Sequence, residues 1–221
     1  MILLKIIAVV LPWPLKRWFL EKLFGYKLHK KARIGLAWCF PKMLIMEEGA
    51  RIAPLNVAGH LDSMELNDYA TIARGNWITG FPSQTDSPHF QHQKERTSCL
   101  LMKQHSAITK NHHIDCTHQV TIGQFTTIAG YRSQLLTHSI DIHSGRQTSA
   151  PIEIGDYCFV GTASVILGGA TLPNYSVLGA MSLLNKTFEQ SYTLYAGVPA
   201  KRVKSINENA KYFTRTEGFI N

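Results

Sequence analysis

Apolar residues recur at every sixth position through the last third of the chain. From Ile154 onward the sequence divides into hexads, with an aliphatic residue first and a small residue fifth, until Phe188 breaks the pattern. A helix would rotate such positions off its apolar face, and an ordinary strand would show period two. The pattern therefore predicts stacked coils with three short sides, each pointing one aliphatic residue inward. The aliphatic positions are Ile154, Val160, Ile166, Leu172, Leu178 and Leu184, and the small ones are Cys158, Ser164, Ala170, Ser176 and Ser182.

Earlier parts of the chain keep the same period but shift its frame, which predicts slightly long turns between coils. Two stretches, 79–100 and 141–151, do not fit the period and are predicted to be excursions, where functional residues often lie. The six-step series are Met46, Ile52, Ala58 and Met64; Leu66, Ile72 and Ile78; Met102, Ile108, Ile114 and Val120; and Ile122, Ile128 and Ile140, with Gln134 in the slot between the last two.

Residues 1–33 carry most of the charge, because their eight basic side chains face Glu21 alone, which gives +7 of the chain's +8. Residues 1–11 are apolar apart from Lys5, but too few to cross a bilayer as a helix. Apolar side chains then recur at helical spacing among cations, at Leu15, Trp18, Phe19, Leu23 and Tyr26. This segment is predicted to be amphipathic and to lie on an anionic membrane surface. Packing on its own domain is the alternative, while Pro-Trp-Pro at 12–14 disfavours a cleaved signal peptide.

Composition narrows the class further. With 221 residues, 45% of them hydrophobic and 17% charged, the chain is neither disordered nor an integral membrane bundle. Outside the N-terminal segment, 15 basic residues nearly balance 14 acidic ones (23 − 8 and 15 − 1), which disfavours a nucleic-acid-binding face. The four cysteines form no C-x-x-C pair, so we expect free thiols in a reducing compartment.

Three segments make the sequence resemble the hexapeptide-repeat acyltransferases, especially the bacterial O-acetyltransferases of polysaccharide and sugar metabolism. They are QLLTHSID (134–141), APIEIGDYCFVGTASVILGGATL (150–172) and YAGVPAKRVK (195–204). The resemblance is strong over 102–204 and weaker over 34–78. Phe159 stands where the family often has Trp, and Gly168-Gly169 stands where it often has Pro-Gly. Neither departure removes a reacting group.

The resemblance implies an all-β fold, a left-handed parallel β-helix over 34–204, between the amphipathic segment 1–33 and a tail at 205–221. It also implies a homotrimer with its active site between neighbouring subunits, acetyl-CoA as the donor, and no metal. The expected acceptor is a sugar hydroxyl of a polysaccharide or glycan precursor. The N-terminal segment favours a lipid-linked precursor at the cytoplasmic face of the bacterial inner membrane. The sugar, the hydroxyl, O- versus N-transfer and the acyl length stay open.

The same resemblance makes His138 the catalytic base, and neutral imidazole suits proton removal near pH 7. Asp141 is the nearest acidic residue that would orient its ring, with a backbone carbonyl as the alternative. The turn at Gly161-Thr162 is expected to stabilise the oxyanion.

Coenzyme A is expected to lie along the later coils. Small residues there would admit its pantetheine arm, and cations would meet its phosphates. The predicted cofactor-binding residues are Gly161, Thr162, Gly179, Ala180, Lys186, Lys201 and Arg202. Asn111, His143 and Arg146 are the predicted acceptor contacts, with a turn asparagine and solvated loop residues as the alternative.

Two other functions remain open on the sequence. One is a zinc enzyme resembling the γ-class carbonic anhydrases, because His113-x4-His118 followed by VTIG matches two of that family's three ligands. His138-x4-His143 has the same spacing, but no histidine stands near Trp77, where the third ligand would lie. The other is a non-catalytic β-helix scaffold that binds a membrane or partner and is indifferent to loss of His138.

Overall fold

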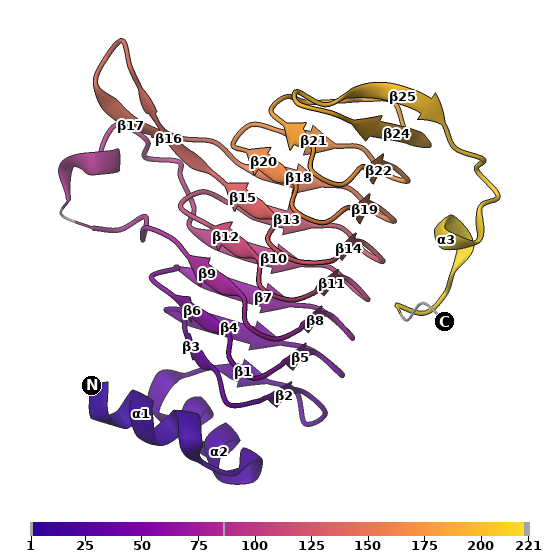
Figure 1. Ribbon diagram of the computed structural model, residues 1–221. Coiled ribbons are helices and arrows are strands. Elements are labelled where there is room, and N and C mark those ends of the chain that lie inside the picture. Colours follow the sequence, from indigo (N-terminus) through magenta and orange to yellow (C-terminus); the bar gives the residue numbers. More distant parts are fainter. Residues whose placement is uncertain (1, 86, 219–221) are drawn as a thin grey trace.

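The hexads fold into three parallel sheets that form the faces of a left-handed β-helix (Figure 1). The structure is a computed structural model that describes residues 2–85 and 87–218. Face A contains β1 (Lys27–Leu28), β4 (Met43–Met46), β7 (Ser63–Leu66), β10 (Cys99–Met102), β13 (Val120–Ile122), β18 (Ile152–Ile154) and β21 (Thr171–Leu172). Face B contains β2 (Arg33–Ile34), β5 (Arg51–Ile52), β8 (Thr71–Ile72), β11 (Ala107–Ile108), β14 (Thr127–Ile128), β19 (Phe159–Val160), β22 (Val177–Leu178), β24 (Thr193–Ala196) and β25 (Lys201–Ser205). Face C contains β3 (Trp38–Phe40), β6 (Val57–Gly59), β9 (Trp77–Thr79), β12 (His113–Asp115), β15 (Gln134–Leu136), β20 (Val165–Leu167) and β23 (Leu183–Leu184).

The aliphatic positions of the hexads fill the interior of the coils, as predicted. Ile154, Val160, Ile166 and their equivalents are almost completely buried. Ile140 departs from the prediction, because it is 56% exposed and Leu135 fills the inward slot instead. The corner before β15 is longer, with Arg132 at positive φ, and the chain leaves the coil soon after Leu136.

Aromatic rings stack along the corner between faces A and B. Each ring belongs to a residue at positive φ, a conformation that costs a non-glycine residue about 1 kcal/mol or more. Neighbouring ring centroids lie 4.7 to 5.2 Å apart, so stacking offsets part of that cost. After β25 in the sequence, the tail returns along this corner through α3 (Lys211–Thr214). Arg215 then lies over two of the rings. The stacked residues are Tyr69, His105, Phe125, Tyr157, Tyr175 and Tyr192.

Both excursions leave the β-helix at the corner between faces C and A, here called the C–A corner (Figure 1). Residues 80–98 join β9 to β10 and contain the short helix η1 (Pro88–Phe90). The second excursion joins β15 to β18 and forms an antiparallel hairpin of β16 (His138–Asp141) and β17 (Arg146–Ser149). The hairpin begins earlier than the predicted boundary at 141, so His138 is its first strand residue.

Two helices, α1 (Ile2–Val10) and α2 (Trp13–Phe24), cover the N-terminal end of the β-helix (Figure 1). Leu20 is buried, and the buried Lys16 donates from Nζ to the carbonyl of Gly35 at 2.7 Å. The segment thus packs on its domain, and strand pairing begins at Lys27, before the expected boundary at 34. No helix in the described part of the chain is long and apolar enough to cross a membrane.

The outer surface of these helices is apolar, although the inner surface packs on the coils. Its side chains are 50% to 69% exposed, an unusual density for a surface not covered by a partner. These residues are Ile2, Leu3, Ile6, Val10, Leu15, Trp18 and Leu23.

Candidate active site

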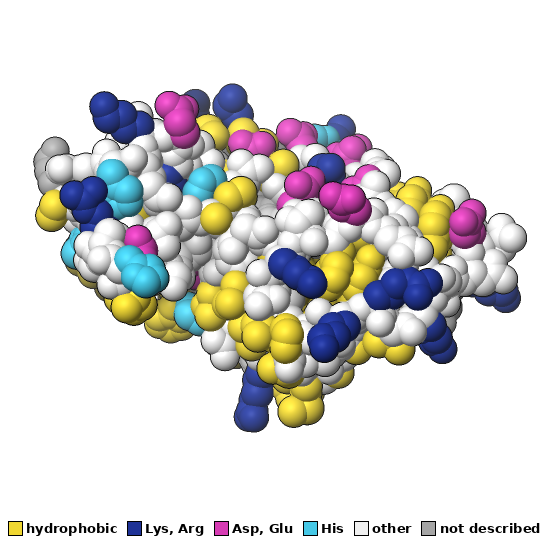
Figure 2. All heavy atoms as spheres, turned by 90° about the horizontal axis from the view of Figure 1, so that it is seen from above, with side chains coloured by type: hydrophobic (Ala, Val, Ile, Leu, Met, Phe, Trp, Pro, Cys, Tyr) yellow, Lys and Arg dark blue, Asp and Glu magenta, His cyan; other side chains and the backbone are white. Residues whose placement is uncertain are grey.

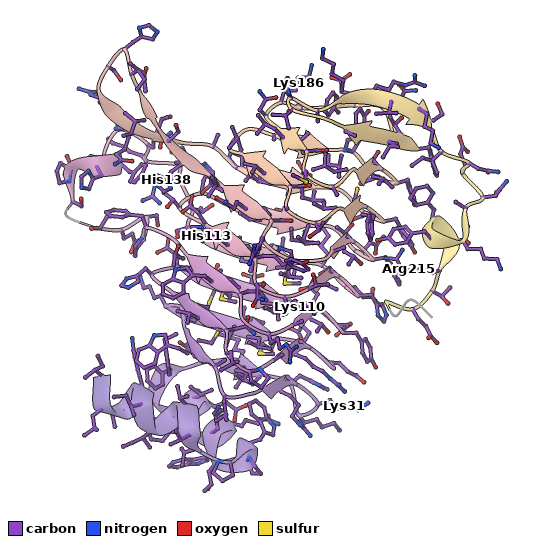
Figure 3. The ribbon with its side chains drawn as sticks, viewed as in Figure 1. Lys31, Lys110, His113, His138, Lys186 and Arg215 are labelled. Carbon is purple, nitrogen blue, oxygen red and sulfur yellow. The ribbon has the colours of Figure 1, made fainter. Side chains whose placement is uncertain are left out.

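Stacking brings three successive C–A corners together. On face C, Asp115 at the end of β12 pairs with Thr79 at the end of β9 and with Leu136 at the end of β15. The first excursion starts after Thr79 and the hairpin starts after Leu136. Asp115 therefore lies between the two excursions, and His138 lies at the base of the hairpin (Figure 3).

Asp115 holds His138 through the Nδ1 atom of the imidazole, which lies 2.8 Å from Asp115 Oδ2. The same oxygen accepts hydrogen bonds from the backbone N–H groups of Thr137 and His138 and from the Thr137 hydroxyl. Oδ1 accepts from the Thr117 N–H and hydroxyl. Burial alone raises the pKa of Asp115, but the hydrogen bonds from Thr117, His138 and Thr137 outweigh it and keep the pKa below its ordinary value. The carboxylate is therefore charged at neutral pH.

A charged carboxylate at Nδ1 fixes which nitrogen of His138 can act as a base. Nδ1 carries the proton and donates it to Asp115, so Nε2 presents its lone pair. Within the described residues no protein group hydrogen-bonds to Nε2, and the side chain is 45% exposed. The geometry thus presents a base to a ligand at this corner.

The hydrogen bond with the His138 ring that was expected from Asp141 is formed by Asp115 instead. Asp141 Oδ1 accepts the N–H of His143 at 3.0 Å, and Oδ2 accepts the hydroxyl of Ser144 at 2.6 Å. Its carboxylate therefore closes the turn of the hairpin. The reason is geometric, because side chains three residues apart in a strand point to opposite faces.

Arg96 fastens the first excursion to this corner. Its buried guanidinium donates to the carbonyls of Phe81, Pro82 and Thr117. It also lies 4.6 Å from the ring centroid of Phe90, whose ring stands edge-on to His138 at 6.5 Å. Arg96 thereby connects the excursion to Thr117, whose N–H and hydroxyl donate to Asp115.

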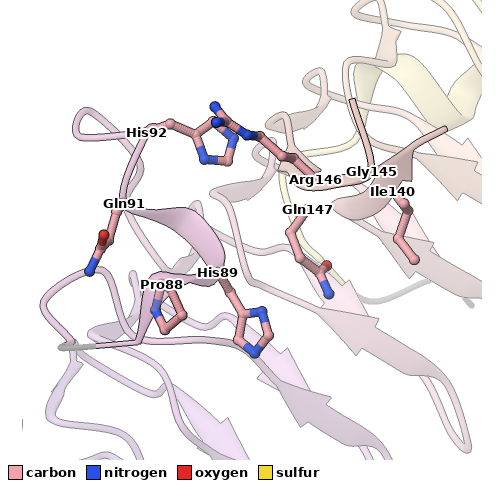
Figure 4. A pocket seen from close by; sticks show the side chains of 8 residues that line it. All are labelled: Pro88, His89, Gln91, His92, Ile140, Gly145, Arg146 and Gln147. Carbon is pink, nitrogen blue, oxygen red and sulfur yellow. The ribbon is translucent and has the colours of Figure 1, made fainter. Parts of the chain in front are cut away.

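A cleft of about 590 Å³ separates the first excursion from the hairpin, a size that suits a small ligand. The two walls are joined at one end, where Gln93 and Ser149 exchange two hydrogen bonds of 2.9 and 2.8 Å. Figure 2 shows histidine and cationic side chains gathered over the side of the molecule that carries the excursions. The lining residues, drawn in Figure 4, are Pro88, His89, Gln91, His92, Ile140, Gly145, Arg146 and Gln147.

Four of the predicted cofactor-binding residues lie at the corner between faces B and C, at the opposite end of the face C strands from His138. A strand rise of about 3.3 Å per residue puts the two places on the order of 20 Å apart within one chain. A Cβ on Gly161 would lie 2.5 Å from the backbone nitrogen of Ala180, and one on Gly179 2.9 Å from Ala196 Cβ. The Thr162 hydroxyl bonds to the backbone of Tyr131. These small residues therefore let successive coils stack closely.

The predicted phosphate-binding cations lie near the C-terminal end of the β-helix. Lys186 Nζ lies 5.2 Å from the ring centroid of Phe188 (Figure 3). Lys201 and Arg202 begin β25, where Arg202 donates to the Ser205 hydroxyl at 2.7 Å. Lys201 and Arg202 lie away from the hairpin base, whereas Lys186 follows β23 at the C–A corner, two coils beyond the hairpin.

The three predicted acceptor contacts lie in different parts of the structure. Asn111, at φ 57°, forms backbone hydrogen bonds with Arg74 and Arg132 at the corner between faces B and C, away from His138. His143 is exposed in the hairpin turn. Arg146 lies opposite Asp141 at the turn end of the hairpin and lines the cleft between the two excursions.

The two histidines of the zinc hypothesis have different surroundings. His113 is exposed on the outer side of β12, with Trp77 and Gln134 at the paired positions of the neighbouring coils. His118 Nδ1 accepts the N–H of Gln119 at 2.7 Å. The described residues contain no group of three or more His, Cys, Asp or Glu side chains that could hold a metal ion.

Several site residues escape sequence reasoning. Asp115 directly follows the inward residue Ile114 and pairs with Leu136, so hexad register alone could have placed it beside Thr137 and His138. Arg96, Phe90 and the cleft-lining His89 and His92 lie in an aperiodic stretch, where no pattern gives a position.

No model of a known protein family matches the chain. Galactoside O-acetyltransferase of Escherichia coli is 34% identical over 70 residues, and a protein of Schizosaccharomyces pombe named as an acetyltransferase is 34% identical over 92 residues. These matches cover 32% and 39% of this chain, and 34% and 44% of the lengths of the two relatives. The solved structure of the polysialic acid O-acetyltransferase OatWY shares the fold, with a TM-score of 0.59 at 15% identity over 86% of this chain and 90% of that chain. Over the matched residues and in its fold, the chain is therefore similar to the hexapeptide-repeat acetyltransferases.

Proposed function

We propose that the protein is an acyltransferase that moves an acetyl group from acetyl-CoA to a sugar hydroxyl, with His138 as general base. The observation that carries this proposal is the pairing of His138 Nδ1 with the buried, charged Asp115, which leaves Nε2 open beside a cleft. Similarity to acetyltransferases supports the donor, and the sugars in the names of two similar proteins, galactoside and polysialic acid, support the acceptor class.

The chemistry needs few groups. The acceptor hydroxyl donates to His138 Nε2, and the imidazole takes its proton as the oxygen attacks the thioester carbonyl. Asp115 stabilises the imidazolium that results, because its carboxylate lies against Nδ1. When the tetrahedral intermediate collapses, the carbon–sulfur bond breaks and the proton passes from imidazolium to the departing thiolate. A free thiol has a pKa of about 8.5, so no stronger acid is needed.

We further propose that the active enzyme is a homotrimer. Four of the seven residues expected to contact coenzyme A lie at the corner between faces B and C, whereas His138 lies at the C–A corner. Two such corners can meet when two subunits pack side by side, so a second copy would complete the site.

Peripheral attachment to a membrane is the third part of the proposal. The outer surface of α1 and α2 exposes apolar side chains, including Trp18 at 59% and Ile6 at 50%, next to the cations of 16–33. Such a surface suits the interface of an anionic membrane. It would place the enzyme at the cytoplasmic face of the inner membrane, with a lipid-linked glycan precursor as acceptor.

Calorimetric titration with acetyl-CoA and coenzyme A tests the donor, and thiol release in the presence of galactosides and sialic acid oligomers tests transfer. The His138→Ala variant is expected to bind acetyl-CoA normally and to lose at least ~10²-fold in kcat, the scale of general-base catalysis. Full activity in this variant, or no binding of acetyl-CoA by the unchanged protein, would contradict the proposal.

A further inference from the structure

The cleft between the two excursions is lined by cationic and titratable side chains from both walls. His89 and His92 come from the first excursion and Arg146 from the hairpin, and no carboxylate is among the described residues that line it. We propose that the cleft binds an anionic group, a carboxylate or a phosphate, carried by the acceptor sugar or the residue next to it. This inference rests on the proposed function and specifies its acceptor.

The cleft lies next to His138, the proposed general base. His138 and Ile140 are two residues apart in β16, so their side chains lie on one face of the hairpin, about 7 Å apart along the strand. Gln147 pairs with Ile140, and Ser149 pairs with His138 and bonds to Gln93 of the opposite wall. A sugar in the cleft would therefore reach His138 Nε2 with a hydroxyl.

Arg146 is available to an anion. Its partner across the hairpin is Asp141, but that carboxylate is occupied by the Ser144 hydroxyl and the His143 N–H. Within the described residues, Arg146 has no carboxylate at ion-pair distance. Figure 4 shows His92 extending from the other wall toward the Arg146 side chain. A guanidinium fork binds carboxylate or phosphate oxygens in pairs, and an imidazole adds a further donor.

Gln147 adds a polar group suited to a sugar. Its Oε1 has no hydrogen-bond partner among the described residues, although it is shielded from solvent. Such an orphaned acceptor is unfavourable unless a ligand supplies a donor. Gln147 lines the cleft, so a turn of its amide brings this acceptor to a sugar hydroxyl held there. Arg146, the preceding residue of β17, leaves the hairpin on the opposite face, and its side chain also lines the cleft.

Three compounds that differ only at C6 test the proposal: methyl α-D-glucoside, its uronate and its 6-phosphate. Binding to the full chain is measured by saturation-transfer NMR without acetyl-CoA, and transfer is measured by thiol release with it. We expect one or both anionic compounds to bind at least ~10-fold more tightly than the neutral glucoside, the scale of one hydrogen bond to a charged group. The uronate and the phosphate then show which anion the cleft prefers.

Arg146→Gln and His92→Gln are expected to remove that preference by raising the Kd and KM of the anionic compounds, without changing the binding of acetyl-CoA. Lys94→Gln is the matched control, because Lys94 is a cation in the same excursion as His92 but does not line the cleft. Equal binding of the three compounds, no binding of any up to about 10 mM, or an unchanged preference in Arg146→Gln overturns the inference. Failure of the proposed function has a different signature, namely no binding of acetyl-CoA and no thiol release while the anion preference persists.

Discussion

Replacing Asp115 by asparagine removes one negative charge from the site and keeps the shape of the side chain. Oδ2 accepts four hydrogen bonds and Oδ1 accepts two. The new amide nitrogen fits better at Oδ1, where the Thr117 hydroxyl can turn to accept from it. The N–H of Thr117 then loses its partner inside the fold, while His138 keeps a neutral acceptor at Nδ1.

Two magnitudes follow from this geometry. An imidazolium and a carboxylate in contact attract by about 4 kcal/mol at an effective dielectric constant of 20, which corresponds to roughly 10³-fold in rate. Solvent screens part of this attraction because the His138 side chain is 45% exposed, so we expect kcat to fall roughly 10²- to 10³-fold. The lost hydrogen bond to a charged acceptor and the orphaned N–H should lower the free energy of unfolding by about 2–4 kcal/mol.

Asp141→Asn is the matched control, since the same change is made three residues from His138 in a carboxylate that closes the hairpin turn. It is expected to change kcat less than ~3-fold, because a half-buried carboxylate in a surface turn contributes little beyond its local bonds. Thiol release from acetyl-CoA measures kcat, and urea unfolding measures stability. Heteronuclear NMR of the imidazole nitrogens reports whether the proton of His138 stays on Nδ1.

The outcome can refute the reasoning in a specific way. If Asp141→Asn abolishes transfer while Asp115→Asn retains it, the orienting role returns to Asp141 and the geometry at the corner is not the catalytic one. If both variants are active and the Nδ1 proton is unchanged, neither carboxylate sets the tautomer.

The remaining predictions concern pH, the excursion and the helices. Burial lowers the pKa of His112 to about 4, and its Nδ1 accepts from the N–H of Ser133, so protonation opposes folding. The unfolded chain takes up this proton near pH 6.5 and the folded chain only near 4. The free energy of unfolding should therefore decrease by at most ~3 kcal/mol as the pH falls from about 6.5 to about 4, and by less in His112→Gln. Urea unfolding at a series of pH values measures both. Arg96→Met is expected to speed hydrogen exchange of residues 80–98 and to raise the KM for the acceptor, while unchanged exchange would contradict its fastening role. Changing Leu15 and Trp18 to serine should reduce sedimentation with anionic vesicles without lowering the melting temperature, and undiminished sedimentation would remove α2 from the membrane contact.

The periodicity predicts the coils well because every inward position, such as Ile108 or Leu172, must fill the same narrow interior. Prediction fails where the chain leaves that interior. Ile140 keeps the spacing but belongs to a hairpin, and Asp141 is near His138 in sequence while Asp115 is near it in space. The partners of His138 depend on the register between coils and on a loop without periodicity. Neither can be inferred from the sequence of a single segment. The resemblance supplied His138 itself, whose role stays a prediction.

Both excursions emerge from the same corner and return to it, and this has an evolutionary consequence. Each coil closes through its own strands, so an excursion can lengthen, shorten or change composition at only the modest entropic cost of a longer loop. Asp115 belongs to a coil and His138 is the first strand residue of the hairpin, whereas His89 and His92 belong to the first excursion. If Asp115 and His138 act as proposed, acceptor choice can diversify through the first excursion while this pair is inherited intact, and grafting residues 80–98 between paralogous scaffolds becomes a route to new specificity.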